Sequence, residues 1–162
     1  MQLLTSVGST FGEANYHLQF TPKYRRDVFV DEDVRKLCRE SFKRTCEELG
    51  IGMEACEFGP DHVHLFVGGC RRYSVSYLAQ RLKGASAHTI RHQLWDRVRG
   101  KLWGDSFWSD GYFYRSVGST TAETVRYYVQ NSQRKHWLPQ VGSKSALLEG
   151  NVNRQTRLAD FS

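Results

Sequence analysis

The sequence lacks the features of membrane-spanning and secreted proteins. No window reaches about 18 uncharged apolar residues, and residues 1–12 contain neither a basic nor an apolar stretch, so we expect no membrane span and no signal peptide. None of the cysteines forms a C-x-x-C pair, which excludes zinc-ribbon and thioredoxin-type motifs. The chain is long enough to fold around a core without disulfides. We therefore predict a cytoplasmic protein in which all four cysteines are small core residues: Cys38, Cys46, Cys56 and Cys70.

The composition excludes intrinsic disorder. Of the 162 residues, 40% are hydrophobic and 13% aromatic, which suffices for the core of one domain. The chain becomes polar after Pro139. We predict a single domain over residues 1–138 and a polar tail over residues 139–162.

Positive charge is concentrated in the middle of the chain. Lys and Arg number 23 against 17 Asp and Glu, giving a net charge of +6. Between Arg71 and Lys101 there are eight basic residues and one acid, Asp96. Such a run favours a polyanionic partner, although a solvated basic helix face would look the same.

Hydrophobic periodicity predicts the first half of the fold. Residues 16–20 alternate as a half-buried strand does, and a spacing near 3.6 predicts a helix that Asp31 caps and Gly50 ends. Residues 51–58 and 62–67 are typical of strands. Gly59, Pro60 and Asp61 between them indicate a turn, so these strands should pair as a hairpin.

Hydrophobic periodicity also predicts the elements in the second half of the chain. Ser74 can cap a helix that buries Val75, Leu78 and Leu82, and residues 112–117 alternate as a strand. Residues 120–123 form a capping box that opens a C-terminal helix. The order strand, helix, strand, strand, helix, strand, helix predicts an α+β, ferredoxin-like (RRM-like) antiparallel sheet with helices on one face and an extra C-terminal helix.

Two histidines one residue apart suggest a metal site. His62 and His64 flank Val63 in a predicted strand, so both imidazoles should point to one face while Val63 points into the core. Two imidazoles side by side make half of a metal site. The alternative is a pair of exposed strand histidines without a ligand.

Tyr127 and Tyr128 lie on the predicted C-terminal helix. A phenol has a pKa of about 10, so as a nucleophile it needs a strongly polarised target, which a divalent cation on phosphate oxygens can provide. Helix tyrosines are also ordinary packing residues, and periodicity alone does not separate the two roles.

Several segments together resemble one enzyme family, the single-tyrosine HUH transposases of insertion sequences that transpose as single-stranded DNA. The resemblance runs in order through the chain from about Tyr16 to Gln133. The segments that carry it are Tyr16-His17-Leu18, Thr21-Pro22-Lys23-Tyr24-Arg25-Arg26, Gly59-Pro60-Asp61-His62-Val63-His64-Leu65, Leu82-Lys83-Gly84, Trp108-Ser109-Asp110-Gly111-Tyr112-Phe113, Ser116-Val117-Gly118 and Tyr128-Val129.

The resemblance implies a metal-dependent DNA strand transferase. His62 and His64 would hold Mg²⁺ or Mn²⁺, and Tyr128 would attack the DNA, leaving a 5′-phosphotyrosine and a free 3′-OH. Tyr128 is favoured over Tyr127 because the family's tyrosine precedes a small β-branched or aliphatic residue, here Val129. The implied substrate is single-stranded DNA with hairpins at the element's ends. The implied assembly is a homodimer in the prokaryotic cytoplasm, associated with the nucleoid when it acts.

The resemblance leaves the third metal ligand open. The family usually places a glutamine four residues after the tyrosine, and here that position is Ser132, between Asn131 and Gln133. Any of the three could serve. It also leaves open the hairpin and cleavage-site sequences, the role of the tail, and whether the tyrosine acts within its own subunit.

Basic and aromatic side chains supply candidate DNA contacts. Tyr24, Tyr73 and Trp103 could stack on unpaired bases. Five basic residues are candidates for phosphate contacts: Lys23, Arg25, Arg26, Arg81 and Lys83.

Two other readings of the sequence stay open. One is a non-catalytic nucleic-acid-binding module on a ferredoxin-like sheet, which would have no use for paired histidines and a helix tyrosine. The other is a domesticated, palindrome-associated tyrosine transposase, which shares the chemistry and differs in its biology.

Overall fold

The structure is a computed structural model that describes residues 4–7, 10–102 and 104–118. These residues belong to one compact unit, Met1–Asn131. The predicted C-terminal helix with Tyr127 and Tyr128, the candidate third ligands, Trp103 and the polar tail lie outside the described residues, as does the predicted domain boundary at residue 138.

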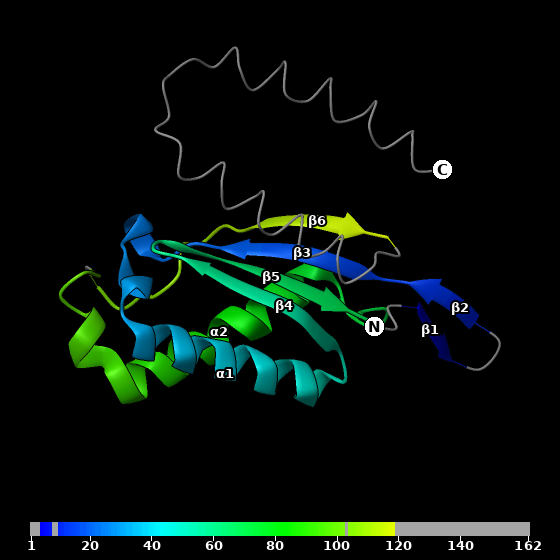
Figure 1. The fold of residues 1–162 in the computed structure, drawn as a ribbon, viewed down its shortest axis with the longest axis horizontal. Helices are drawn as coiled ribbons and strands as arrows, with labels where there is room; N and C mark the ends of the chain where they lie inside the picture. Colours follow the sequence, from blue (N-terminus) through cyan, green and yellow to red (C-terminus); the bar gives the residue numbers. More distant parts are fainter. Residues whose placement is uncertain (1–3, 8–9, 103, 119–162) are drawn as a thin grey trace, which may run out of the picture. The chain divides into compact units, whose positions relative to one another are not determined.

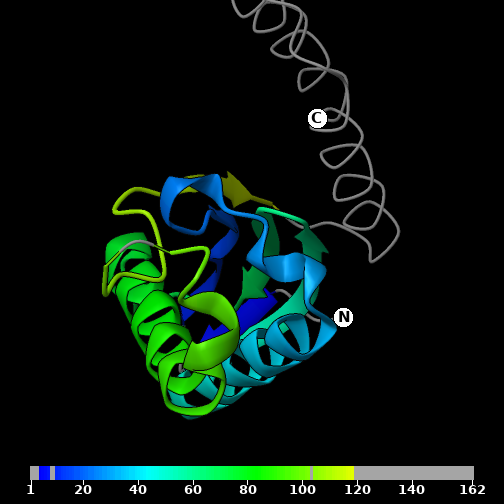
Figure 2. The ribbon, with the colours of Figure 1, turned by 90° about the vertical axis from the view of Figure 1, so that its left-hand side faces the viewer.

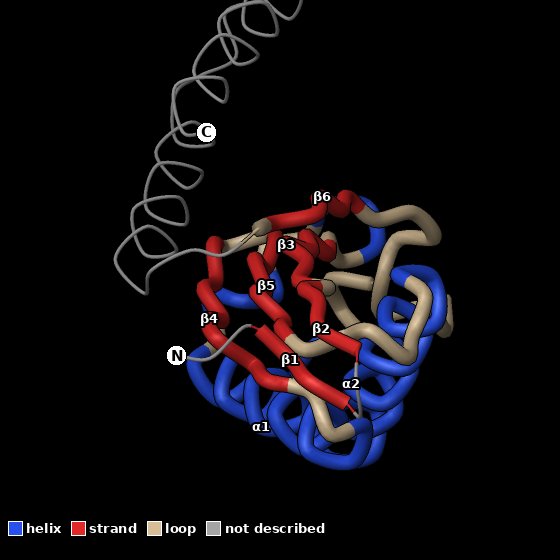
Figure 3. The backbone as a smooth tube through the Cα atoms, turned by 90° about the vertical axis from the view of Figure 1, so that its right-hand side faces the viewer, coloured by secondary structure: helices blue, strands red, loops and turns tan. Residues whose placement is uncertain are grey.

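The centre of the fold is an antiparallel sheet of four strands with two helices on one of its faces (Figures 1 and 3). The helices lie side by side and pack against each other (Figure 2). In sheet order the strands are β4 (Gly52–Gly59), β5 (His62–Gly68), β3 (Asn15–Phe20) and β6 (Phe113–Val117), and the helices are α1 (Glu32–Leu49) and α2 (Val75–Val98). This arrangement confirms the predicted ferredoxin-like α+β fold.

Capping residues set the ends of the helices where the sequence indicated. The Asp31 carboxylate accepts hydrogen bonds from the backbone N–H groups of Asp33 and Val34 at the start of α1. Gly50 ends α1 with a φ of 68°, a left-handed conformation that glycine adopts without steric cost. Ser74 caps α2 through the N–H of Tyr77.

The β4–β5 hairpin places two different sets of side chains on the two faces of the sheet. Pro60 and Asp61 form its turn, and Gly59 pairs with His62. Because side chains alternate along a strand, Val63, Leu65 and Val67 join the core under the helices. Their neighbours on β5 take the opposite face. All residues of β5, an inner strand of the sheet, are buried.

Two strands and two short 3₁₀ turns before α1 were not predicted. Strands β1 (Leu4–Val7) and β2 (Thr10–Glu13) form a separate two-stranded antiparallel sheet in which Val7 pairs with Thr10 (Figure 3). The sequence between them, Gly8-Ser9, is a dipeptide typical of hairpins and is a local signal that could have indicated this pairing. Two short 3₁₀ turns, Lys23–Arg25 and Val28–Val30, connect β3 to α1.

Lys83 fastens the loop before β6 to α2. Its ammonium Nζ donates to the backbone carbonyls of Ser109 at 2.6 Å, Asp110 at 3.1 Å and Gly111 at 3.3 Å. Burial lowers the pKa of this ammonium. An ammonium has three N–H donors, so these contacts engage them all and disfavour the phosphate contact predicted for Lys83. One turn further along α2, Ser86 accepts the indole N–H of Trp108 at 2.9 Å.

Replacement of Lys83 should therefore destabilise the fold. We expect Lys83→Met to lower the free energy of unfolding by about 1–3 kcal/mol, because three loop carbonyls lose a charged donor. The matched control is Lys43→Met on the exposed side of α1, which should leave stability nearly unchanged. Urea unfolding of both variants measures the difference, and equal midpoints would contradict a structural role for Lys83.

Candidate functional site

His62 and His64 lie next to each other on the face of the sheet opposite the helices. Their ring centroids are 5.0 Å apart, and the residues are 2% and 1% exposed. The predicted shared face is confirmed, and their burial contradicts the alternative of two solvent-exposed histidines. Phe66 follows on the same side of β5, and His17 on β3 joins them. We call this surface, formed by His17, His62, His64 and Phe66, the histidine face.

Asp61 orients His62. The Asp61 carboxylate Oδ1 lies 2.8 Å from His62 Nδ1, while its Oδ2 lies 3.4 Å from Arg25 Nε. An ionised carboxylate can only accept, so Nδ1 of His62 donates, and in a neutral imidazole with this proton the lone pair is on Nε2. Carboxylate-histidine pairs of this kind orient imidazole ligands in metal sites.

Gly59 leaves room for the His62 ring. A Cβ added at Gly59 would overlap the imidazole atoms of His62 across the hairpin. Only glycine lacks that atom, so the ring can lie directly over the backbone of β4. The Gly59-Pro60-Asp61-His62 segment therefore supplies the turn, the space and the hydrogen-bond partner for one imidazole.

The Gly59→Ala variant tests this packing. We expect it to displace the His62 ring and to lower the free energy of unfolding by about 1–3 kcal/mol, the usual cost of overpacking. A matched control is Gly84→Ala on α2, where an added Cβ meets nothing within 4 Å. That substitution should be neutral or stabilising, since alanine favours helix over glycine. Thermal melts of both variants measure the effect, and a Gly59→Ala protein as stable as the parent would contradict the overlap.

His64 is held by a third histidine. His17 Nε2 lies 2.9 Å from His64 Nδ1. The His17 ring stacks on Phe66 with centroids 4.7 Å apart and an interplanar angle of 10°, and it meets the edge of Phe113 at 5.8 Å. Burial, with a smaller effect from Arg115, lowers the pKa of His17 to about 4. His17 is therefore neutral near pH 7.

The histidine pair fits part of a divalent-metal site. Both residues present imidazole nitrogens on one face, and each Nδ1 already has a partner, so Nε2 is the atom that would bind a metal. Among the described residues no cluster of three or more His, Cys, Asp or Glu could hold a metal. Mg²⁺ and Mn²⁺ prefer oxygen ligands, so further ligands would come from DNA phosphate and from the candidates Asn131, Ser132 and Gln133.

Three of the candidate DNA-binding residues cluster at the end of the sheet that carries His62. Lys23, Arg25 and Arg26 follow β3, and Arg25 touches Asp61. Tyr24 and Arg25 adopt positive φ angles of 59° and 51°, and the Tyr24 side chain is 58% exposed. This turn therefore presents positive charge and an aromatic ring beside the histidine face.

The basic run from Arg71 to Lys101 is partly neutralised by ion pairs. Arg81 lies on the helical side of the molecule, where it contacts Glu48 of α1 and the ring of Tyr77. Tyr73, a candidate stacking residue, is half-buried and donates its hydroxyl to the Leu49 carbonyl. Four of the eight basic residues in the run pair with acids: Arg81 with Glu48, Arg97 with Asp31 and Asp33, Arg99 with Asp96, and Lys101 with Asp27.

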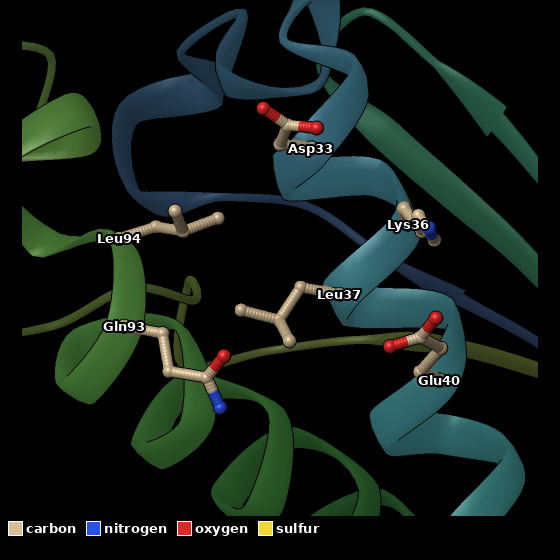
Figure 4. Close-up of a pocket in the computed structure, with 6 residues that line it drawn as sticks. All are labelled: Asp33, Lys36, Leu37, Glu40, Gln93 and Leu94. Carbon is tan, nitrogen blue, oxygen red and sulfur yellow. The ribbon is translucent and has the colours of Figure 1, made fainter.

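The residues that line a groove between α1 and α2 include no histidine. Leu37 and Leu94 face each other across it, and charged side chains of α1 line its rim (Figure 4). It lies in the helical layer, whereas the histidines point to the other face of the sheet. We therefore assign the chemistry to the histidine face.

Comparison with known proteins identifies the family. The family model described as "Transposase IS200 like" matches residues 10–132. The chain belongs to this transposase family. The assignment confirms the resemblance to single-tyrosine HUH transposases and makes the protein a DNA-transposing enzyme. Among the described residues, no helix is both long and apolar enough to span a membrane.

Named relatives agree with this assignment. The transposase for insertion sequence element IS200 of Salmonella typhimurium is 31% identical over 122 residues, covering 75% of this chain and 79% of that protein. The ISDra2 transposase TnpA of Deinococcus radiodurans is 28% identical over 123 residues, covering 76% of this chain and 86% of the relative.

Solved structures share the fold. The crystal structure of a candidate transposase from Deinococcus radiodurans R1 superposes with a TM-score of 0.63 at 27% identity, covering 78% of this chain and 96% of the other. A REP-associated tyrosine transposase bound to a REP hairpin gives a TM-score of 0.52 at 13% identity, and the match covers 83% of this chain and 76% of the other. At that identity the second similarity shows the fold alone.

Proposed function

We propose that this transposase cleaves and rejoins single-stranded DNA through a 5′-phosphotyrosine on Tyr128, at a metal site built on His62 and His64. The observation that carries the proposal is the buried histidine pair, with each Nδ1 engaged by a separate partner. Such an arrangement presents two Nε2 atoms in fixed orientations. A simple nucleic-acid-binding sheet has no use for it.

The reaction follows from these groups. The Tyr128 hydroxyl oxygen gives up its proton and attacks the scissile phosphorus, the bond from phosphorus to the O3′ oxygen breaks, and that oxygen takes up a proton and leaves as a free 3′-OH. Bound Mg²⁺ or Mn²⁺ supplies polarisation of the scissile phosphate. Rejoining is the reverse, when a 3′-OH attacks the phosphotyrosine. The phosphotyrosine retains the energy of the broken phosphodiester bond, so no nucleotide hydrolysis is needed. The sequence accordingly has no G-x-x-x-x-G-K-[ST] loop.

DNA with hairpins at the element's ends is the proposed substrate. The basic turn of Lys23, Arg25 and Arg26, with exposed Tyr24, lies beside His62 and can bind backbone and bases close to the cleavage point. A REP hairpin is bound to a structural relative of the same fold, which supports the proposed substrate class. We also propose a homodimer, in which the tyrosine of one subunit is able to complete the site of the other.

Formation of a covalent adduct tests the proposal. Labelled single strands from the element's ends are incubated with the protein, with and without Mn²⁺, and resolved on a denaturing gel. We expect a metal-dependent protein-DNA adduct that Tyr128→Phe abolishes. His64→Ala should slow its formation by about 100-fold or more, because the metal contributes several kcal/mol to the barrier. The matched control, Tyr127→Phe, removes the neighbouring hydroxyl and should retain the adduct.

Two outcomes would overturn the proposal. Adduct formation by Tyr128→Phe would place the nucleophile elsewhere. Tight DNA binding without an adduct under any divalent metal would instead indicate a non-catalytic binding module.

Paired substitutions test the DNA-contact surface. We expect Lys23→Ala combined with Arg26→Ala to weaken hairpin binding and to reduce the slope of log K against log salt by about 2, since each lost phosphate contact removes about one unit. The control is Arg81→Ala, because Arg81 pairs with Glu48 on the helical side and should change the slope little. Fluorescence anisotropy at several salt concentrations measures both slopes. A larger change of slope for Arg81→Ala than for the double variant would place the DNA-binding surface on the helices.

A further inference from the structure

His17 occupies a position on the histidine face that the proposed chemistry does not use directly. It lies on β3 opposite Phe66 of β5, while Gln19 lies opposite His64. The His17 ring therefore reaches His64 diagonally, and its Nε2 comes within 2.9 Å of His64 Nδ1. The sequence alone gave no reason to assign His17 a role in the site.

A hydrogen bond between two neutral imidazoles has one donor and one acceptor, so this contact has two forms. If His64 donates its Nδ1–H, the His64 Nε2 carries a lone pair. If His17 donates instead, the proton of His64 sits on Nε2, which then cannot ligate a metal. Only the first form is compatible with the metal site of the proposed function, on which this inference rests.

The surroundings of His17 fix its ring. The residue is 2% exposed, and its strand is paired on both sides, with β5 and β6. Phe66 stacks parallel to the imidazole and Phe113 packs against it edge-on, which limits rotation of the ring away from His64.

The two histidines of the pair thus differ in how their tautomers are set. Asp61 can only accept, so its contact admits a single form for His62. His17 can donate or accept, so His64 depends on which form its neighbour takes. We propose that His17 is a positioning residue that accepts the Nδ1–H of His64 and thereby presents His64 Nε2 to the metal.

The tautomer is measurable in the unaltered, metal-free protein. Histidine side chains labelled with ¹⁵N give long-range proton-nitrogen spectra that distinguish the two tautomers, and the His64 signals are assigned by their loss in His64→Ala. We expect His64 to be protonated at Nδ1. A proton on His64 Nε2 would overturn the proposal, and this measurement needs no variant of His17 to fold.

Variants of His17 test the consequence for metal binding, with Mn²⁺ alone as the probe and calorimetry of the full chain as the readout. His17→Phe keeps an aromatic ring on Phe66 but removes the acceptor, and we expect Mn²⁺ to bind about 10-fold or more weakly, as for other orienting partners of metal ligands. His17→Gln restores an acceptor oxygen and should recover most of the affinity. The control His88→Phe, on the exposed side of α2, should bind as the parent does.

The outcomes separate this inference from the function it rests on. If the parent binds Mn²⁺ no more tightly than His64→Ala, the metal site of the proposed function fails and this inference fails with it. If His64→Ala weakens binding while His17→Phe binds as tightly as the parent, the metal site stands and the role of His17 is refuted. Equal weakening in His17→Phe and His17→Gln would likewise refute it, because restoring an acceptor would have no effect.

Discussion

The alternation of side chains along β5 is the constraint on which both the core and the candidate site depend. Val63, Leu65 and Val67 pack under α1 and α2, and this burial fixes the register of the strand. A shift of one residue would move His62 and His64 into the apolar core and the valines to the histidine face. The hydrophobic core therefore holds the two imidazoles in place, although it does not touch the chemistry.

Around that strand, each imidazole takes a partner from a different element. Asp61 comes from the hairpin turn, His17 comes from β3, and Gly59 leaves space on β4. Burial of polar rings costs free energy unless they are hydrogen-bonded, and these partners offset that cost while they orient the rings. The site is therefore built from the sheet itself and from the turn that joins two of its strands.

The positively charged residues divide between two roles. Lys83 and Arg97 hold loops and helix ends together through carbonyls and carboxylates. Lys23 and Arg25 also contact carboxylates, those of Asp110 and Asp61, but they lie at the sheet end beside His62, where a DNA backbone would approach the histidine face. A count of charges along the chain thus located the basic residues without separating structural contacts from candidate DNA contacts.

The sequence by itself determined the order of strands and helices, the caps at Asp31 and Ser74, and the shared face of His62 and His64, because these depend on periodicity and local hydrogen bonding. It also determined the family, through motifs that the comparisons confirm. Only the tertiary structure decided that His17 meets His64, 47 residues away, and that Lys83 binds a loop 26 to 28 residues further on. Contacts of that kind depend on strand register and packing between distant segments, which local patterns do not encode.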